Sequence, residues 1–153
     1  MNIKILGAFA GVALLAACSA TPAPKPAATT MSGPTPGSEE DLVQNVGDRI
    51  FYAFDSSALS AQAQATLDKQ AAWLQKYPNN NVLIAGNCDE RGTEEYNLAL
   101  GWRRANADKN YLVAHGVAAS RLQTISYGKD RPVALGHNEQ AWAQNRNAIT
   151  SVK

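Results

Sequence analysis

The sequence predicts an α/β domain in which short strands alternate with helices. Three observations predict it: short apolar runs bounded by polar turns, longer stretches with apolar residues at helical spacing, and a change in composition near residue 39. With 153 residues, of which 45% are hydrophobic, the chain can bury one core but is too short for a two-domain enzyme. A formal net charge of +1 gives no electrostatic basis for a nucleic-acid partner.

The first half of the domain reads as strand, helix, strand. Residues 48–54 mix aromatic and branched side chains and predict a strand. A helix over 60–77 begins at Ser60, whose hydroxyl can cap it, and ends before Pro78. Its apolar residues recur at helical spacing: Leu59, Ala63, Leu67, Ala71 and Leu74. Residues 82–85 form a continuous apolar run that is typical of a central strand.

The second half repeats the alternation. A long helix is predicted from Glu94 to His115, with Gly116 as its stop signal. A third strand is centred on Ile125, and a short helix over 138–144 precedes a last strand over 148–152. The predicted order is therefore β-α-β-α-β-α-β.

The segment before the domain is read as a leader and a linker. Residues 1–17 place one lysine before an apolar run that is too short to span a ~30 Å hydrocarbon layer, as in a secretory signal. The run ends in Leu15-Ala16-Ala17-Cys18, which resembles the bacterial lipobox and implies cleavage before Cys18 and acylation of that cysteine. By the same resemblance, Ser19 implies sorting to the outer membrane, with the domain facing the periplasm. The alternative is an ordinary signal peptide with an incidental cysteine.

The linker is expected over 18–40 and the folded domain over 41–153. Five of the seven prolines lie in residues 19–38, which lack apolar periodicity. Such a stretch cannot bury enough surface to offset its ordering entropy, so we expect a partly extended tether.

Asp89 and Arg104 are the candidate functional pair. Asp89 lies in the loop 86–93, directly after an apolar strand, and glycines at both ends of the loop suggest tight turns. On the following helix, Asn97, Leu100 and Arg104 share one face, so Arg104 is expected half buried, leaning toward the Asp89 loop and in need of a carboxylate.

The pairing has two interpretations that the spacing leaves open. Asp89 and Arg104 can form a structural salt bridge. They can also clasp a zwitterion, with the carboxylate taking an ammonium and the guanidinium taking a carboxylate through two hydrogen bonds. A third interpretation, a cell-wall glycan hydrolase using Asp89 and Glu90, is disfavoured because adjacent loop residues rarely converge on one bond.

The stretch GNCDERGTEEYNLALGWRRANA closely resembles the OmpA-type peptidoglycan-binding domain family, and SYGKDRPVALGHNEQAW extends the match. The resemblance implies an α+β sandwich with a four-stranded mixed sheet packed on helices, no cofactor or metal, and no enzymatic activity. It implies capture of the diaminopimelate of peptidoglycan stem peptides, with Asp89 on the ammonium and Arg104 on the carboxylate. Residues at matching positions would complete the site: Asn97, Leu100, Phe54 and Asp55.

The family also implies the periplasmic protein TolB as a partner, within the Tol system, and a role in envelope integrity and cell division. Arg146 matches the first arginine of the closing Asn-Arg-Arg triplet of the family pattern. The sequence departs from that pattern at Cys88, Trp102, Asp108 and Asn147. Asp108 lies four residues after Arg104, and we expect it to compete with Asp89 for that guanidinium. Cys88 is interpreted as a small buried residue at a strand end.

Overall fold

The computed structural model describes residues 33–153. The predictions for the leader 1–17, for Cys18 and for the linker up to residue 32 fall outside these residues.

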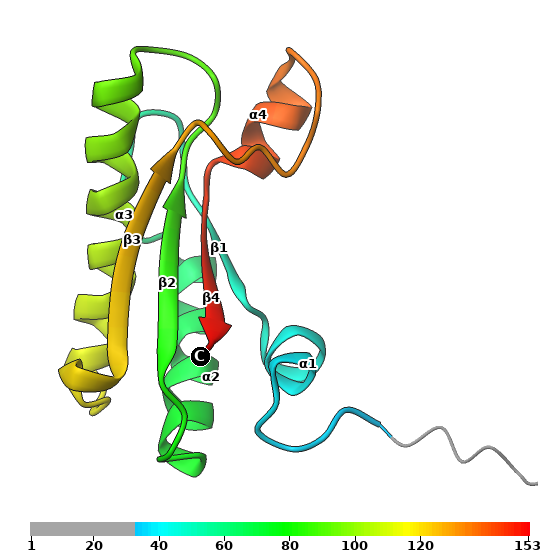
Figure 1. Cartoon of the computed structure of the whole chain (residues 1–153), viewed down its shortest axis with the longest axis vertical. Coiled ribbons are helices and arrows are strands. Elements are labelled where there is room, and N and C mark those ends of the chain that lie inside the picture. The colour runs from blue at the N-terminus through cyan, green and yellow to red at the C-terminus, as the bar shows by residue number, and fades with distance from the viewer. Residues whose placement is uncertain (1–32) are drawn as a thin grey trace, which may run out of the picture. The chain divides into compact units, whose positions relative to one another are not determined.

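A four-stranded mixed sheet forms the centre of the domain, in the order β1-β4-β2-β3. The edge strand β1 (Arg49–Phe51) is antiparallel to β4 (Asn147–Val152), which is antiparallel to β2 (Val82–Asn87). The other edge strand, β3 (Leu122–Gly128), runs parallel to β2. The long helices α2 (Ala61–Lys76) and α3 (Glu94–Ala114) lie on the same side of the sheet, and α4 (Glu139–Asn145) lies beyond the end of β2 (Figure 1).

The predicted order of strands and helices is confirmed, and so is the four-stranded mixed sheet. Three helices begin where a side-chain oxygen accepts from a backbone N–H of the first turn, at Ser60, Thr93 and Asn138. The C-terminal end of α3 also agrees with the predicted one, because Gly116 follows the helix with φ +90°. Strand β2 extends two residues beyond its predicted end, to Asn87.

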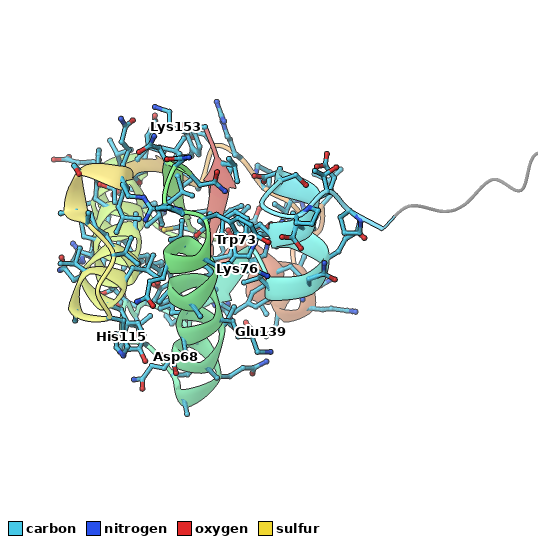
Figure 2. All side chains as sticks on the ribbon, turned by 90° about the horizontal axis from the view of Figure 1, so that it is seen from below. Asp68, Trp73, Lys76, His115, Glu139 and Lys153 are labelled. Carbon is cyan, nitrogen blue, oxygen red and sulfur yellow. The ribbon has the colours of Figure 1, made fainter. Side chains whose placement is uncertain are left out.

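The sequence analysis missed two short helical pieces. The first is α1 (Glu39–Asp41), which continues into a π-helical turn, Leu42–Val46. Asp41 joins it to α2 by accepting a hydrogen bond from Trp73 Nε1 at 2.9 Å, and Figure 2 shows Trp73 on the side of α2 that faces α1. Hydrogen bonds from Gly37, Trp73 and Asn45 lower the pKa of Asp41 to about 2. The second is a 3₁₀ turn, Ala119–Arg121, before β3.

Helix α3 packs unusually close to β2 because two glycines meet. A Cβ at Gly86 would lie 1.9 Å from the carbonyl oxygen of Gly101, and a Cβ at Gly101 would lie 2.2 Å from Ser126 Oγ. The expected tight turn at Gly86 is therefore wrong: Gly86 lies within β2, and its role is to let the helix backbone approach. This approach brings α3 against the strand end that carries Asp89.

Asp108 does not contact Arg104, so the expected competition with Asp89 is wrong. Its Oδ1 lies 2.5 Å from the hydroxyl of Tyr52, which also donates to the backbone oxygen of Arg104 at 3.0 Å, and its Oδ2 is buried without a hydrogen-bond partner. Desolvation raises the pKa of Asp108 to about 7 against the hydrogen bond from Tyr52, which lowers it. Tyr52 has a single hydroxyl proton for two acceptors. When Asp108 is protonated, it can donate to the hydroxyl oxygen of Tyr52 and leave the hydroxyl proton to the backbone oxygen of Arg104.

The glycine contact predicts a large effect of a single methyl group. Gly86→Ala and Gly101→Ala should each lower the free energy of unfolding by about 2 kcal/mol or more, because backbone must move to admit the Cβ. Gly33→Ala is the matched control, since a Cβ there meets nothing within 4 Å. Urea denaturation measures all three, and wild-type stability in both core variants would contradict the packing role.

The raised pKa of Asp108 predicts that the stability of the domain depends on pH. A carboxyl group whose pKa rises from 3.8 to about 7 on folding destabilises the native state progressively as pH rises through that interval, with no further change well above 7. Asp108→Asn removes this titration, so its unfolding free energy relative to wild type should rise by about 2–3 kcal/mol between pH 5 and pH 8. Chemical denaturation at both pH values tests this, and parallel pH profiles for the two proteins would refute it.

Candidate functional site

A pocket of about 170 Å³ lies where β2 ends and α3 begins. Its walls come from the loop after β1, the loop after β2, the first half of α3 and the residue that precedes β4. It is lined by all six predicted site residues, Phe54, Asp55, Asp89, Asn97, Leu100 and Arg104, together with residues that were not predicted, Cys88, Arg91, Gly92, Tyr96 and Arg146.

The loop that carries Asp89 is held by its own backbone and by Asn97. Gly92 turns the chain with φ +93°, a conformation that favours glycine, and Thr93 then caps α3. The side-chain amide of Asn97 donates to the carbonyl oxygens of Arg91 at 2.8 Å and Thr93 at 3.0 Å. Asn97 therefore lines the pocket as a brace of the loop.

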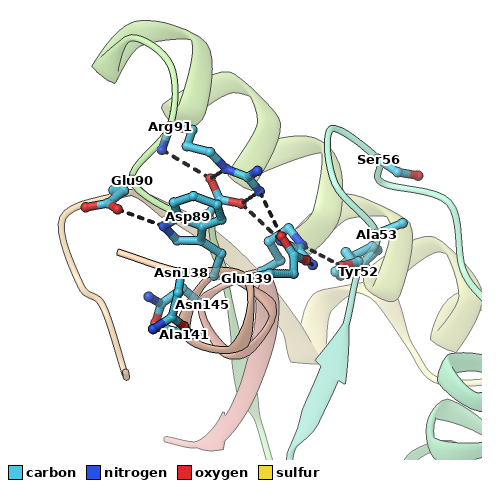
Figure 3. Close-up of polar contacts among 12 residues, drawn as sticks. Tyr52, Ala53, Ser56, Asp89, Glu90, Arg91, Asn138, Glu139, Ala141 and Asn145 are labelled. Carbon is cyan, nitrogen blue, oxygen red and sulfur yellow. Dashed lines mark hydrogen bonds and ion pairs between the residues drawn. The ribbon is translucent and has the colours of Figure 1, made fainter. Parts of the chain in front are cut away.

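Asp89 is buried, 4% exposed, and both carboxylate oxygens have partners. Oδ1 accepts from the backbone N–H and Nε of Arg91, both at 3.1 Å, and Oδ2 accepts from Arg91 Nη2 at 2.6 Å and Arg146 Nη1 at 3.3 Å. The close-up shows the Asp89 carboxylate facing the Arg91 guanidinium (Figure 3). Burial would raise the pKa of Asp89, but the hydrogen bonds from the two arginines outweigh it and hold that pKa below its usual value.

Arg104 is fully buried and is satisfied by backbone carbonyls, which corrects the expected half-buried pair with a carboxylate. Nε donates to Ser56 O at 2.9 Å, Nη1 to Asn87 O at 2.7 Å and Nη2 to Ala53 O at 3.2 Å. The salt bridge between Asp89 and Arg104 is therefore wrong, although both residues line one pocket. The hydrogen-bond acceptors of Arg104 are neutral carbonyls, which do not offset its positive charge. This charge can therefore attract an anionic group of a ligand in the pocket.

Arg146 is a site residue that sequence reasoning did not place there. It is buried and links three parts of the site: Nη1 donates to Asp89, Nε to Tyr52 O at 3.1 Å and Nη2 to Glu139 Oε1 at 2.6 Å. The signal was its match to an arginine of the family pattern. No helix or strand period relates it to Asp89, because the contact spans 57 positions of the chain.

Arg91 was also missed, although it lies two residues after Asp89. Its guanidinium carbon lies 4.1 Å from the ring centroid of Phe54 and 4.0 Å from that of Trp142, within the range of cation–π contacts. Its Nη2 lies 3.8 Å from Glu139 Oε2. Arg91 thus covers the pocket beside the largely exposed ring of Phe54.

Asp55 also lines the pocket, and the hydroxyl of Tyr96 donates to its carboxylate. It is the one non-glycine residue of segment 33–153 with positive φ, at 51°. The pocket thus holds three guanidiniums, of Arg91, Arg104 and Arg146, against the carboxylates of Asp55 and Asp89. Chemically, it can take a ligand that offers a cation and at least one anionic group.

Glu90 faces away from this pocket. It accepts from Trp142 Nε1 at 2.7 Å and lies 2.7 Å from His137 Nδ1, and these contacts lower its pKa. The carboxyl groups of Asp89 and Glu90 therefore do not form the facing pair that glycoside hydrolysis requires. Residues 33–153 also contain no cluster of three or more His, Cys, Asp or Glu side chains that could hold a metal ion.

Two departures from the family pattern lie next to the site. Cys88 is buried, as expected, and its thiol lies 3.3 Å from the carbonyl oxygen of Asn97; burial raises its pKa. Asn147 is buried as well, and its Oδ1 accepts from Asn87 Nδ2 at 2.8 Å. Asn147 therefore supports the strand end whose carbonyl binds Arg104.

The fold and the sequence match known proteins. The model of the OmpA family matches residues 51–146. The peptidoglycan-associated lipoprotein of Mesorhizobium japonicum is 47% identical over 152 residues, which cover 97% of this chain and 90% of that protein. The protein of the same name from Rhizobium meliloti is 59% identical over 116 residues, 76% of this chain and 66% of that protein.

Solved structures agree. The peptidoglycan-associated lipoprotein of Burkholderia pseudomallei matches with a TM-score of 0.68 and 45% identity, covering 69% of this chain and 90% of that one. The C-terminal domain of Helicobacter pylori MotB, with a TM-score of 0.65 and 20% identity over 69% of this chain and 84% of that one, shares the fold. The predicted family is confirmed, as is the prediction that the chain is not an enzyme, so the glycan-hydrolase alternative is wrong. The chain belongs to the OmpA family, in the group whose curated members are named peptidoglycan-associated lipoprotein.

Proposed function

We propose that this protein is an outer-membrane lipoprotein whose domain binds peptidoglycan non-covalently through the diaminopimelate of stem peptides. The observation that carries the proposal is the pocket at the end of β2. It holds a buried carboxylate, Asp89, and the uncompensated charge of Arg104 in one hollow with an apolar wall from Leu100. The names of the relatives support peptidoglycan as the partner.

Diaminopimelate fits the charges of the pocket. Its free end carries an ammonium and a carboxylate on one carbon, so both charges must be met within a few ångströms. Asp89 takes the ammonium, and the guanidiniums that surround it take the carboxylate through charge-assisted hydrogen bonds. Lysine at the same position of a stem peptide keeps the ammonium but lacks this carboxylate, so the pocket should discriminate against it.

The anchor and the partners rest on the resemblance described above. Acylation of Cys18 would hold the chain in the outer membrane, since each buried methylene contributes about 0.8 kcal/mol and several chains together make detachment negligible. A tether of the length of residues 19–38 reaches at most ~60 Å at ~3.1 Å per residue, which lets the domain meet the wall away from the lipid. TolB would bind the same domain within the Tol system and link the protein to envelope integrity and cell division.

Asp89→Asn tests the site. The full chain should sediment with peptidoglycan that contains diaminopimelate but not with the lysine type, and free meso-diaminopimelate should block sedimentation. Asp89→Asn should lower the affinity for the wall at least about tenfold. The ligand ammonium then has no Asp89 carboxylate to bind, and Arg91 and Arg146 lose the same carboxylate as a partner. Asp130→Asn, an exposed carboxylate outside the pocket, is the matched control.

Asp89 also contacts Arg91 and Arg146, so stability is measured beside binding. The melting temperature of the wild type should rise on addition of meso-diaminopimelate, and that of Asp89→Asn should not. A variant that loses stability but sediments with the wall like the wild type would reject the site and leave Asp89 a structural residue.

A further inference from the structure

We propose that Arg91 is a displaceable internal partner that occupies Asp89 in the free protein and turns to the ligand carboxylate on binding, which makes it a specificity-determining residue. This inference rests on the proposed function and deepens it. It explains how a carboxylate that is already satisfied can receive an ammonium.

The free site has no vacant acceptor on Asp89. Four N–H groups approach its two oxygens, three from Arg91 and one from Arg146. With the carboxylate 4% exposed and held by four donors, an incoming ammonium must replace at least one of them. Binding is therefore an exchange of cations at Asp89.

Arg91 is the partner that can leave. The Arg146 side chain is 8% exposed and is held by Tyr52 and Glu139, so moving it would strand buried hydrogen-bond donors. The Arg91 side chain is 31% exposed, and its guanidinium bonds only to Asp89 at hydrogen-bond distance among the residues of the described domain. The cost of release is thus lower for Arg91.

Leaving Asp89 does not expel Arg91 from the pocket rim. Its guanidinium carbon lies 4.1 Å from the ring centroid of Phe54 and 4.0 Å from that of Trp142, and cation–π contacts of this kind survive a small rotation of the guanidinium. Glu139 Oε2, 3.8 Å away, offers a second carboxylate on the same side. Figure 3 shows Glu139 on α4 near the Asp89–Arg91 pair.

The exchange creates a preference for a zwitterion. A ligand with an ammonium alone breaks the two side-chain hydrogen bonds between Arg91 and Asp89 and offers the Arg91 guanidinium no new acceptor. A group with an ammonium and a carboxylate supplies a new anion to Arg91 as it takes Asp89, so both charges stay paired. Arg91 thereby penalises lysine more than diaminopimelate.

The test compares two ligands on two proteins. In calorimetry with the full chain, the lysine ligand is Nα-acetyl-lysine amide, which offers a side-chain ammonium without a free carboxylate. Arg91→Gln should raise the affinity for this ligand about fivefold or more, since its ammonium no longer competes with a guanidinium. The affinity for meso-diaminopimelate should stay level or fall, so the ratio of the diaminopimelate affinity to the lysine affinity should drop at least about fivefold. Arg91→Lys should return part of the preference, and Arg131→Gln, an exposed charge change outside the pocket, should leave both affinities unchanged.

A second measurement follows Arg91 in the wild type. The side-chain Nε–H signal of Arg91 should shift on saturation with meso-diaminopimelate, as its bond to Asp89 breaks. An unchanged signal overturns the inference, as does an equal fall of both affinities in Arg91→Gln, which would make Arg91 an ordinary ligand contact. If the wild type binds neither diaminopimelate nor the wall, the proposed function fails and the inference fails with it; binding without release of Arg91 rejects the inference alone.

Discussion

The burial of one guanidinium shapes the site. Arg104 reaches carbonyls of Ala53 and Ser56, in the loop after β1, and of Asn87, at the end of β2. A buried charge is costly unless its hydrogen atoms are satisfied, so these segments must converge on it. The convergence brings Phe54, Asp55 and Asp89 to the walls of one pocket. Because carbonyls neutralise no charge, the same arrangement that holds the fold leaves an attraction for anions.

Charge pairing across the pocket is shared among several groups. Asp89 is shared by Arg91 and Arg146, and Glu139 receives Arg146 and lies near Arg91. In such a network, one hydrogen-bond donor of Asp89 can be exchanged while another donor still satisfies the buried carboxylate. A single isolated salt bridge does not allow this exchange. The arrangement therefore suits the reversible, non-covalent binding that we propose for this pocket.

Local sequence signals predicted the elements well and the contacts poorly. The cap at Ser60 and the apolar spacing of α2 are properties of neighbouring residues, so the sequence exposes them. The helical face of Asn97, Leu100 and Arg104 likewise follows from spacing, and all three line the pocket. Arg91 lies two residues from Asp89 and was overlooked, whereas the contact between Arg146 and Asp89 joins segments 57 positions apart, and no period encodes it. The role of Gly86 was missed for the same reason, since its partner Gly101 lies on another element.

Asp108 shows how a departure from the family pattern can fit this site. Tyr52 contacts both buried arginines, since its hydroxyl donates to the backbone of Arg104 and its carbonyl accepts from Arg146. An ionised Asp108 would place an unpaired negative charge one helical turn from Arg104. That charge would attract the Arg104 guanidinium and so compete with the carboxylates of the pocket for it. Desolvation opposes that ionisation, and the neutral acid instead completes the hydrogen bonds of Tyr52. Below its pKa of about 7 this buried acid is mostly neutral and leaves the charges of the arginines to the pocket and its ligand.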